Sequence, residues 1–73
     1  MDRSFYQFAL SYRGGEKNDP HSVFAETMFK DLSFPKDERS FDTLSRYIEE
    51  KGDPLMPSIL FDELYRHYEE RFL

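Results

Sequence analysis

The sequence predicts an all-α domain built from four helices. Apolar residues recur at intervals of three and four along most of the chain, residues typical of helix ends separate these stretches, and no stretch alternates strictly between apolar and polar residues as a strand would. A chain of 73 residues forms one domain, residues 1–73, and buries only about 60% of the surface that the unfolded chain exposes. Since there is no cysteine, packing of the eight Phe and five Tyr must supply the stability.

The first predicted helix follows the N-terminus. It has an apolar stripe at i, i+3, i+4 and i+7, consisting of Phe5, Phe8, Ala9 and Tyr12, with Tyr6 and Leu10 on a neighbouring face. Because this helix is apolar around most of its girth, it is expected to lie centrally. It ends at Gly14 and Gly15, where a glycine can adopt the left-handed conformation at low cost.

The second predicted helix begins with Asp19 as N-cap and Pro20 at the first helical position. Its apolar stripe consists of Ala25, Met28, Phe29 and Leu32, widened by Val23 and Phe24. The helix is expected to end near Ser33, because Pro35 disfavours helical angles at Phe34. The sequence therefore changes direction at a corner formed by Phe34 and Pro35.

Two more helices complete the expected fold. Ser40 is the predicted N-cap of the third, which carries Phe41, Leu44, Tyr47 and Ile48 and ends at Gly52. The fourth carries Phe61, Leu64, Tyr65, Tyr68 and Phe72. It has two alternative starts: a cap at Asp53 and Pro54, or an extra short helical turn near residues 53–57 followed by a restart at Ser58.

Charge and hydropathy argue against several functional classes. The net charge is −5, and residues 47–73 carry seven acidic and three basic side chains, which disfavours binding to a phosphate backbone. No apolar run approaches the roughly 18 residues that cross a bilayer, and the N-terminus shows no export signal. We therefore expect a cytoplasmic protein that does not bind membranes.

The sequence predicts no catalytic, cofactor-binding or metal-binding residues, and hence no enzyme. Glu63, His67 and Glu70 can share one helix face, but a solvated acidic face with an ordinary histidine explains them better than a metal site does. The adjacent pair Glu49 and Glu50 points to different sides of a helix and cannot flank a substrate bond together.

Several segments together resemble a known family. These are "SFYQFALSYR", "FAETMFKDLSFPK", "FDTLSRYIE" and "FDELYRHYEE", of which the most specific part runs from Asp31 to Lys36. In this order and spacing they are similar to the YozE-like family of small, uncharacterised bacterial proteins, over essentially the whole chain. The resemblance implies a bundle like the sterile alpha motif (SAM) and brings no established activity. Pro54 and Pro57 depart from the family pattern before the last helix.

Two kinds of partner follow from the surface residues. We favour an interaction module for an unknown protein, with the module itself a monomer or a weak homo-oligomer. Its candidate surface consists of Phe34, Pro35, Lys36, Arg39 and Arg46, with Tyr6 or Tyr47 nearby. For Phe34 itself we favour a simpler role, as a plug that folds over the ends of the second and third helices.

The alternative is a nucleic-acid-binding module. Its basic patch consists of Lys30, Lys36, Arg39 and Arg46. Asp31, Asp37, Glu38 and Asp42 are interleaved with these cations, and such a mixed run is usually a solvated surface. A third hypothesis, that the acidic last helix occupies a basic partner, depends on net charge alone.

Overall fold

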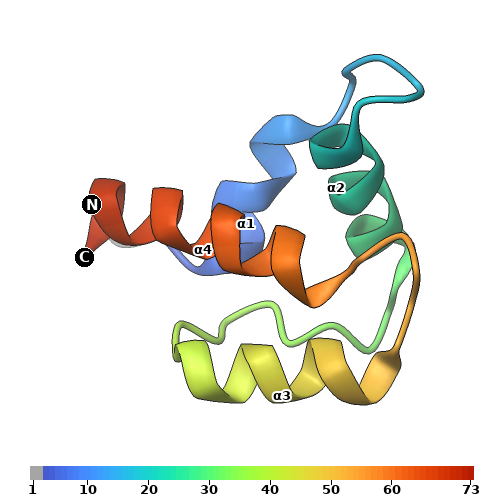
Figure 1. Ribbon diagram of the computed structural model, residues 1–73. Coiled ribbons are helices and arrows are strands. Elements are labelled where there is room, and N and C mark those ends of the chain that lie inside the picture. Colours follow the sequence, from blue (N-terminus) through green and yellow to red (C-terminus); the bar gives the residue numbers. More distant parts are fainter. Residues whose placement is uncertain (1–2) are drawn as a thin grey trace.

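The computed structural model describes residues 3–73 and confirms the all-α fold of four helices. The helices are α1 (Phe5–Ala9), α2 (Pro20–Lys30), α3 (Phe41–Lys51) and α4 (Ser58–Phe72), and the 3₁₀ turn η1 (Leu10–Tyr12) continues α1 (Figure 1). α4 contacts each of the other three helices, so it lies at the centre of the bundle together with α1. Residues 3–73 contain no strand.

The start of α2 and both ends of α3 follow local side-chain chemistry, as predicted, whereas the first helix ends before the predicted Gly14 and Gly15, with α1 ending at Ala9 and η1 at Tyr12. The Asp19 carboxylate caps α2 by accepting from the His21 N–H at 3.0 Å, and Pro20 occupies the first helical position. The Ser40 hydroxyl caps α3. Gly52 ends α3 in the left-handed conformation with φ of 61°, where an L side chain would be strained.

The structure decides between the two predicted starts of the last helix. The Met56 N–H donates to the Asp53 carbonyl at 2.9 Å, which makes one hydrogen-bonded turn. α4 then begins at Ser58, with Pro57 in extended conformation before it. Pro57 thus ends the turn and starts the helix, because it lacks only a donor that a first turn leaves unpaired.

Aromatic rings fill the core, and Phe5 of α1 lies at its centre. Its ring contacts that of Phe61 at 5.1 Å between centroids, and also those of Phe24 and Tyr68, all in edge-to-face geometry. The Tyr68 hydroxyl donates to the Arg3 carbonyl, which ties the N-terminal segment to α4. The buried apolar set also includes Phe8, Ala9, Ala25, Met28, Leu44, Ile48, Met56 and Leu64.

Part of the predicted apolar stripe of α2 was wrong. The helix ends at Lys30, so Leu32 lies beyond it and is 87% exposed. Phe29 is 44% exposed, and the Arg13 guanidinium covers its ring at 3.6 Å from the centroid. The helical spacing predicted both residues in the core. That prediction required the helix to extend to Leu32, and it took no account of a side chain from another element, such as Arg13, covering Phe29.

Candidate interaction surface

Asp31, the residue after α2, fixes the corner that joins α2 to α3. Its side chain is only 8% exposed. The carboxylate accepts hydrogen bonds from the Ser33 N–H at 3.0 Å, from the Lys51 ammonium at 3.2 Å and from the Tyr47 hydroxyl. One short side chain therefore joins the end of α2, the corner and α3.

Protonation equilibria reflect this network. Burial alone would raise the pKa of the Asp31 carboxyl, but the hydrogen bonds from Tyr47, Ser33 and Lys51 outweigh burial and lower that pKa below its usual value. Burial, reinforced by the neighbouring Asp31 carboxylate, raises the pKa of Tyr47 to about 12. At neutral pH, Asp31 is thus an anion and Tyr47 a neutral donor.

Phe34 is the plug that the sequence predicted. It is 2% exposed, and its ring lies between those of Tyr6 and Tyr47, at centroid distances of 5.7 and 5.4 Å. Its N–H donates to the Asp31 carbonyl at 3.1 Å. Both predicted neighbours are present. With so little exposed surface, Phe34 stabilises the corner and cannot be an exposed anchor for a partner.

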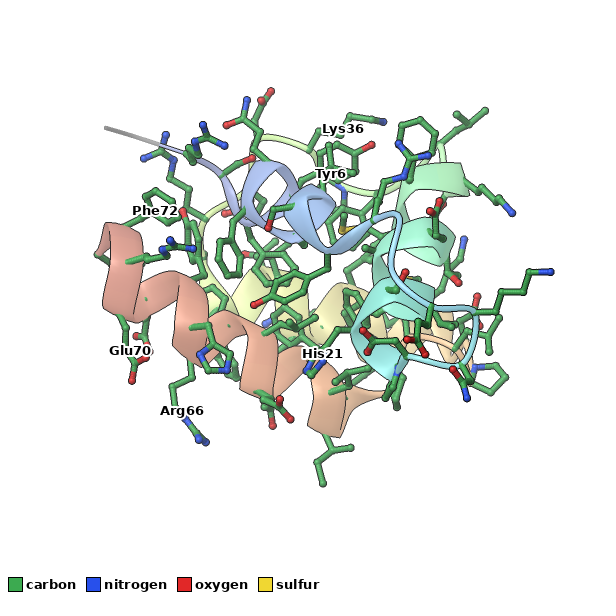
Figure 2. The ribbon with its side chains drawn as sticks, turned by 90° about the horizontal axis from the view of Figure 1, so that it is seen from above. Tyr6, His21, Lys36, Arg66, Glu70 and Phe72 are labelled. Carbon is green, nitrogen blue, oxygen red and sulfur yellow. The ribbon has the colours of Figure 1, made fainter. Side chains whose placement is uncertain are left out.

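The outer side of the corner is formed by Pro35 and Lys36. Pro35 is half-buried, whereas Lys36 is exposed. The Lys36 ammonium lies 5.5 Å from the centroid of the Tyr6 ring, and Figure 2 shows the two side chains together beside α1. This face therefore presents an exposed cation near a buried aromatic ring.

The four cations of the alternative patch are exposed but have different surroundings. Lys30, at the end of α2, lines a groove of about 320 Å³ that also includes Leu55. Lys36 lies over Tyr6, Arg46 is on α3, and the Arg39 carbonyl accepts from the Tyr65 hydroxyl at 2.6 Å. A continuous basic patch formed by these four cations stays a prediction.

Exposed leucines were missed by the sequence analysis. Leu32 is 87% exposed and Leu55 is 52% exposed. Two contacts show that the segments carrying these leucines lie side by side. Lys51 binds Asp31, the neighbour of Leu32, and Lys30 lines the same groove as Leu55. Helical periodicity could not reveal this, since both leucines lie outside helices.

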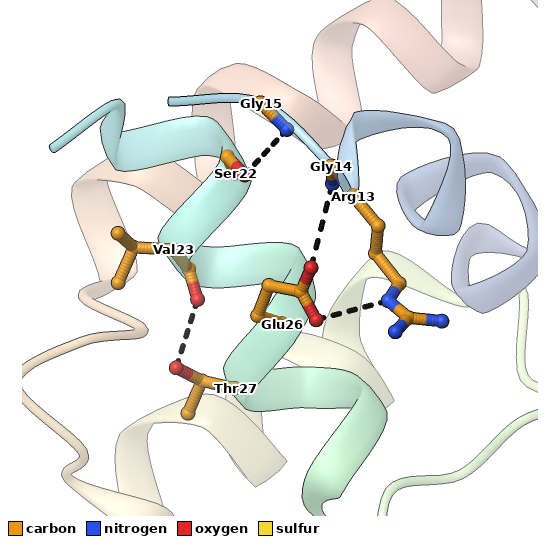
Figure 3. Close-up of polar contacts among 7 residues, drawn as sticks. All are labelled: Arg13, Gly14, Gly15, Ser22, Val23, Glu26 and Thr27. Carbon is orange, nitrogen blue, oxygen red and sulfur yellow. Dashed lines mark hydrogen bonds and ion pairs between the residues drawn. The ribbon is translucent and has the colours of Figure 1, made fainter. Parts of the chain in front are cut away.

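The loop after η1 is held by polar contacts that serve the fold. Glu26 of α2 accepts from the Arg13 side chain at 3.0 Å and from the Gly14 N–H at 3.4 Å, and the Gly15 N–H donates to Ser22 at 3.1 Å (Figure 3). The hydrogen bond from Arg13 lowers the pKa of the Glu26 carboxyl. A Cβ at position 15 would lie 3.0 Å from the Ser22 Cβ, which is tighter than an ordinary contact, so this close approach favours glycine.

The histidines do not form a metal site. His21 Nε2 lies 2.8 Å from the Glu63 carboxylate, so it links the start of α2 to α4. His67 Nδ1 lies 3.9 Å from the Glu70 carboxylate on α4, while Glu63 pairs with His21 instead. Across residues 3–73, no group of three or more potential ligands is placed to hold a metal ion.

In the part of the chain that the structure describes, no helix combines the length and the apolar character needed to span a bilayer. The longest is α4, which has 15 residues and carries charged side chains on its exposed face.

Comparisons with known proteins place this geometry in context. The model of the YozE SAM-like fold family matches residues 4–70. A UPF0346 protein of Staphylococcus epidermidis is 49% identical over 67 residues, covering 92% of this chain and 88% of the relative. One of Staphylococcus haemolyticus is 49% identical over 69 residues, covering 94% and 92%, and one of Staphylococcus aureus is 46% identical over 67 residues, covering 92% and 89%. None of these names specifies an activity.

Proposed function

The chain belongs to the YozE SAM-like family, and from this premise we propose that it is a non-catalytic module that binds a protein partner. The observation that carries the proposal is an exposed leucine on a rigid corner. Leu32 is 87% exposed, while the residues on either side of it are fixed by hydrogen bonds. The corner thus presents an apolar side chain that the fold does not use.

Rigidity makes this leucine suitable for recognition. The Asp31 N–H donates to the Met28 carbonyl at 3.1 Å, and the Ser33 N–H donates to the Asp31 carboxylate at 3.0 Å. Because the backbone of Leu32 is already ordered, a partner that covers it loses little conformational entropy. Leu55 on the adjoining segment and Lys36 on the corner extend the surface with an apolar and a charged group, the usual composition of an interface centre and its rim.

The absence of catalysis is part of the proposal. The best-placed titratable groups are engaged in the fold: Asp31 holds Tyr47 and Lys51, and His21 pairs with Glu63. Catalysis needs a base or nucleophile that is free to reach a substrate in a cleft. Nucleic-acid binding has less support than protein binding, because the exposed cations lie among acidic residues on a chain of net charge −5.

Affinity capture from an extract of the cells that naturally produce this protein tests the proposal. The full chain, Leu32→Ser and Leu55→Ser are immobilised in parallel, with and without nuclease. Ile59→Ser is the matched control, since Ile59 is 81% exposed and lies on α4. We expect one protein to be retained by the parent and by the control, and to be depleted with Leu32→Ser. Equal retention by all chains, or loss on nuclease treatment, would contradict the proposal.

A further inference from the structure

A groove of about 430 Å³ lies between the N-terminal segment and the end of α4. It is lined by Arg3, Phe8, Ser11, Arg71 and Phe72, so two of its five residues are arginines and none is acidic. We propose that this groove binds an acidic segment of a protein partner, whose carboxylates pair with Arg3 and Arg71. The site shares with the proposed function the premise of a protein partner, but it uses none of the corner residues.

The groove is built on ordered elements. The Tyr68 hydroxyl holds the Arg3 carbonyl, and the side chains of Ser4 and Gln7 cap the start of α1 reciprocally. Phe8 is 3% exposed, and its ring meets that of Phe72 at 5.9 Å between centroids, with an angle of 71°. The floor is therefore a fixed apolar pair, and the arginines project from anchored backbone.

The charges around the groove favour an anion. Within residues 3–73, neither Arg3 nor Arg71 has a carboxylate within 4 Å. The acids of α4 are directed elsewhere: Glu63 pairs with His21, and Figure 2 shows Glu70 on the opposite side of α4 from Phe72. The remaining two acidic residues of α4, Asp62 and Glu69, line a different groove beside Phe41. A basic groove thus lies on a chain of net charge −5.

A carboxylate-bearing peptide suits this groove better than a nucleic acid does. Two guanidinium groups can each bind one carboxylate through paired hydrogen bonds, and the half-buried Phe72, backed by the buried Phe8, offers contact to an apolar residue between the carboxylates. An extended polyanion would also have to pass the acidic side chains of residues 47–73, which outnumber the basic ones. A short acidic segment needs only the groove.

Nuclear magnetic resonance titration of the full chain with a defined probe tests the inference. The probe is acetyl-Glu-Leu-Glu-Leu-Glu-amide, and its all-Gln counterpart, acetyl-Gln-Leu-Gln-Leu-Gln-amide, is the neutral control. We expect saturable shifts confined to residues 3–11 and 68–73, lost with the neutral peptide. Arg3→Gln combined with Arg71→Gln should weaken the apparent affinity about tenfold or more.

The matched control removes the same charge from other exposed positions, through Lys17→Gln combined with Arg46→Gln. Equal weakening by both double variants would show general electrostatic attraction and overturn the inference, as would tighter binding of the oligonucleotide dT5 at the same residues. Leu32→Ser should leave the titration unchanged. If the peptide does not bind but Leu32→Ser still depletes the captured protein, only the groove is rejected. If the peptide binds but Leu32→Ser retains the captured protein, only the corner is rejected.

Discussion

Replacing Phe34 by alanine should destabilise the domain severely. The side chain is 2% exposed and lies between the rings of Tyr6 and Tyr47, so truncation empties a ring-sized space. Loss of the buried ring costs about 1.5–3 kcal/mol in transfer free energy. A cavity of roughly 100 Å³ adds about 2.4 kcal/mol if the surroundings do not relax. Since the corner is a loop and can relax partly, we expect a total of about 3–5 kcal/mol.

This loss is large for so small a protein. Domains of this length have unfolding free energies of about 4–11 kcal/mol, so Phe34→Ala removes a large part of the total. Thermal unfolding followed by circular dichroism should show a midpoint at least about 12 °C lower than that of the parent. Urea unfolding at 25 °C supplies the free energy itself, and an unchanged m-value would show that the unfolding reaction stays the same.

Two companion variants make the test specific. Phe34→Leu keeps most of the apolar volume and should lose less than half as much as Phe34→Ala. Lys36→Ala, on the exposed side of the corner, should change the unfolding free energy by less than about 1 kcal/mol, the upper range for an exposed cation over a ring. A Phe34→Ala protein that melts like the parent would refute the plug, whatever the controls do.

Three further predictions concern the corner and the end of α3. Because its folded-state pKa is lowered, Asp31 should stabilise the domain at neutral pH and lose this effect as pH falls below about 4, so the stability gap between parent and Asp31→Asn should narrow in urea titrations toward pH 2. In an ultraviolet titration at 295 nm, Tyr47→Phe should remove a phenol that ionises near pH 12, and loss of a phenol that ionises near pH 10 instead would contradict the pairing with Asp31. Gly52→Ala should cost about 1–2 kcal/mol in chemical denaturation, since φ is 61° and the added Cβ would make only an ordinary contact, 3.9 Å from the Glu49 carbonyl oxygen; Gly52→Asn should cost less.

Local chemistry made much of the fold predictable. Asp19 with Pro20, Ser40 and Gly52 act on backbone groups within a few residues, so their roles as caps are legible in the sequence alone. Pro35 similarly forced the break that turns Phe34 inward. These predictions succeeded because the interactions span a single turn of chain.

Most of the contacts that the sequence did not predict join residues distant in sequence. Phe29 is covered by Arg13, which lies on another element, and no spacing rule within α2 contains that contact. The network of Asp31 with Tyr47 and Lys51 spans 16 and 20 residues. The groove of Arg3 and Arg71 forms where the N-terminal segment lies against the end of α4, and no pattern along the sequence predicts that contact.

The segment that most resembles the family therefore has a structural explanation. From Asp31 to Phe34, three of the four residues bind the corner together: Asp31 by its carboxylate, Ser33 by its N–H and Phe34 by its buried ring. On our proposals, recognition depends on side chains that the packing of the domain leaves exposed, such as Leu32 within the segment and Arg3 with Arg71 outside it. Because these side chains contribute little to the packing of the domain, replacing them should change binding without changing the fold.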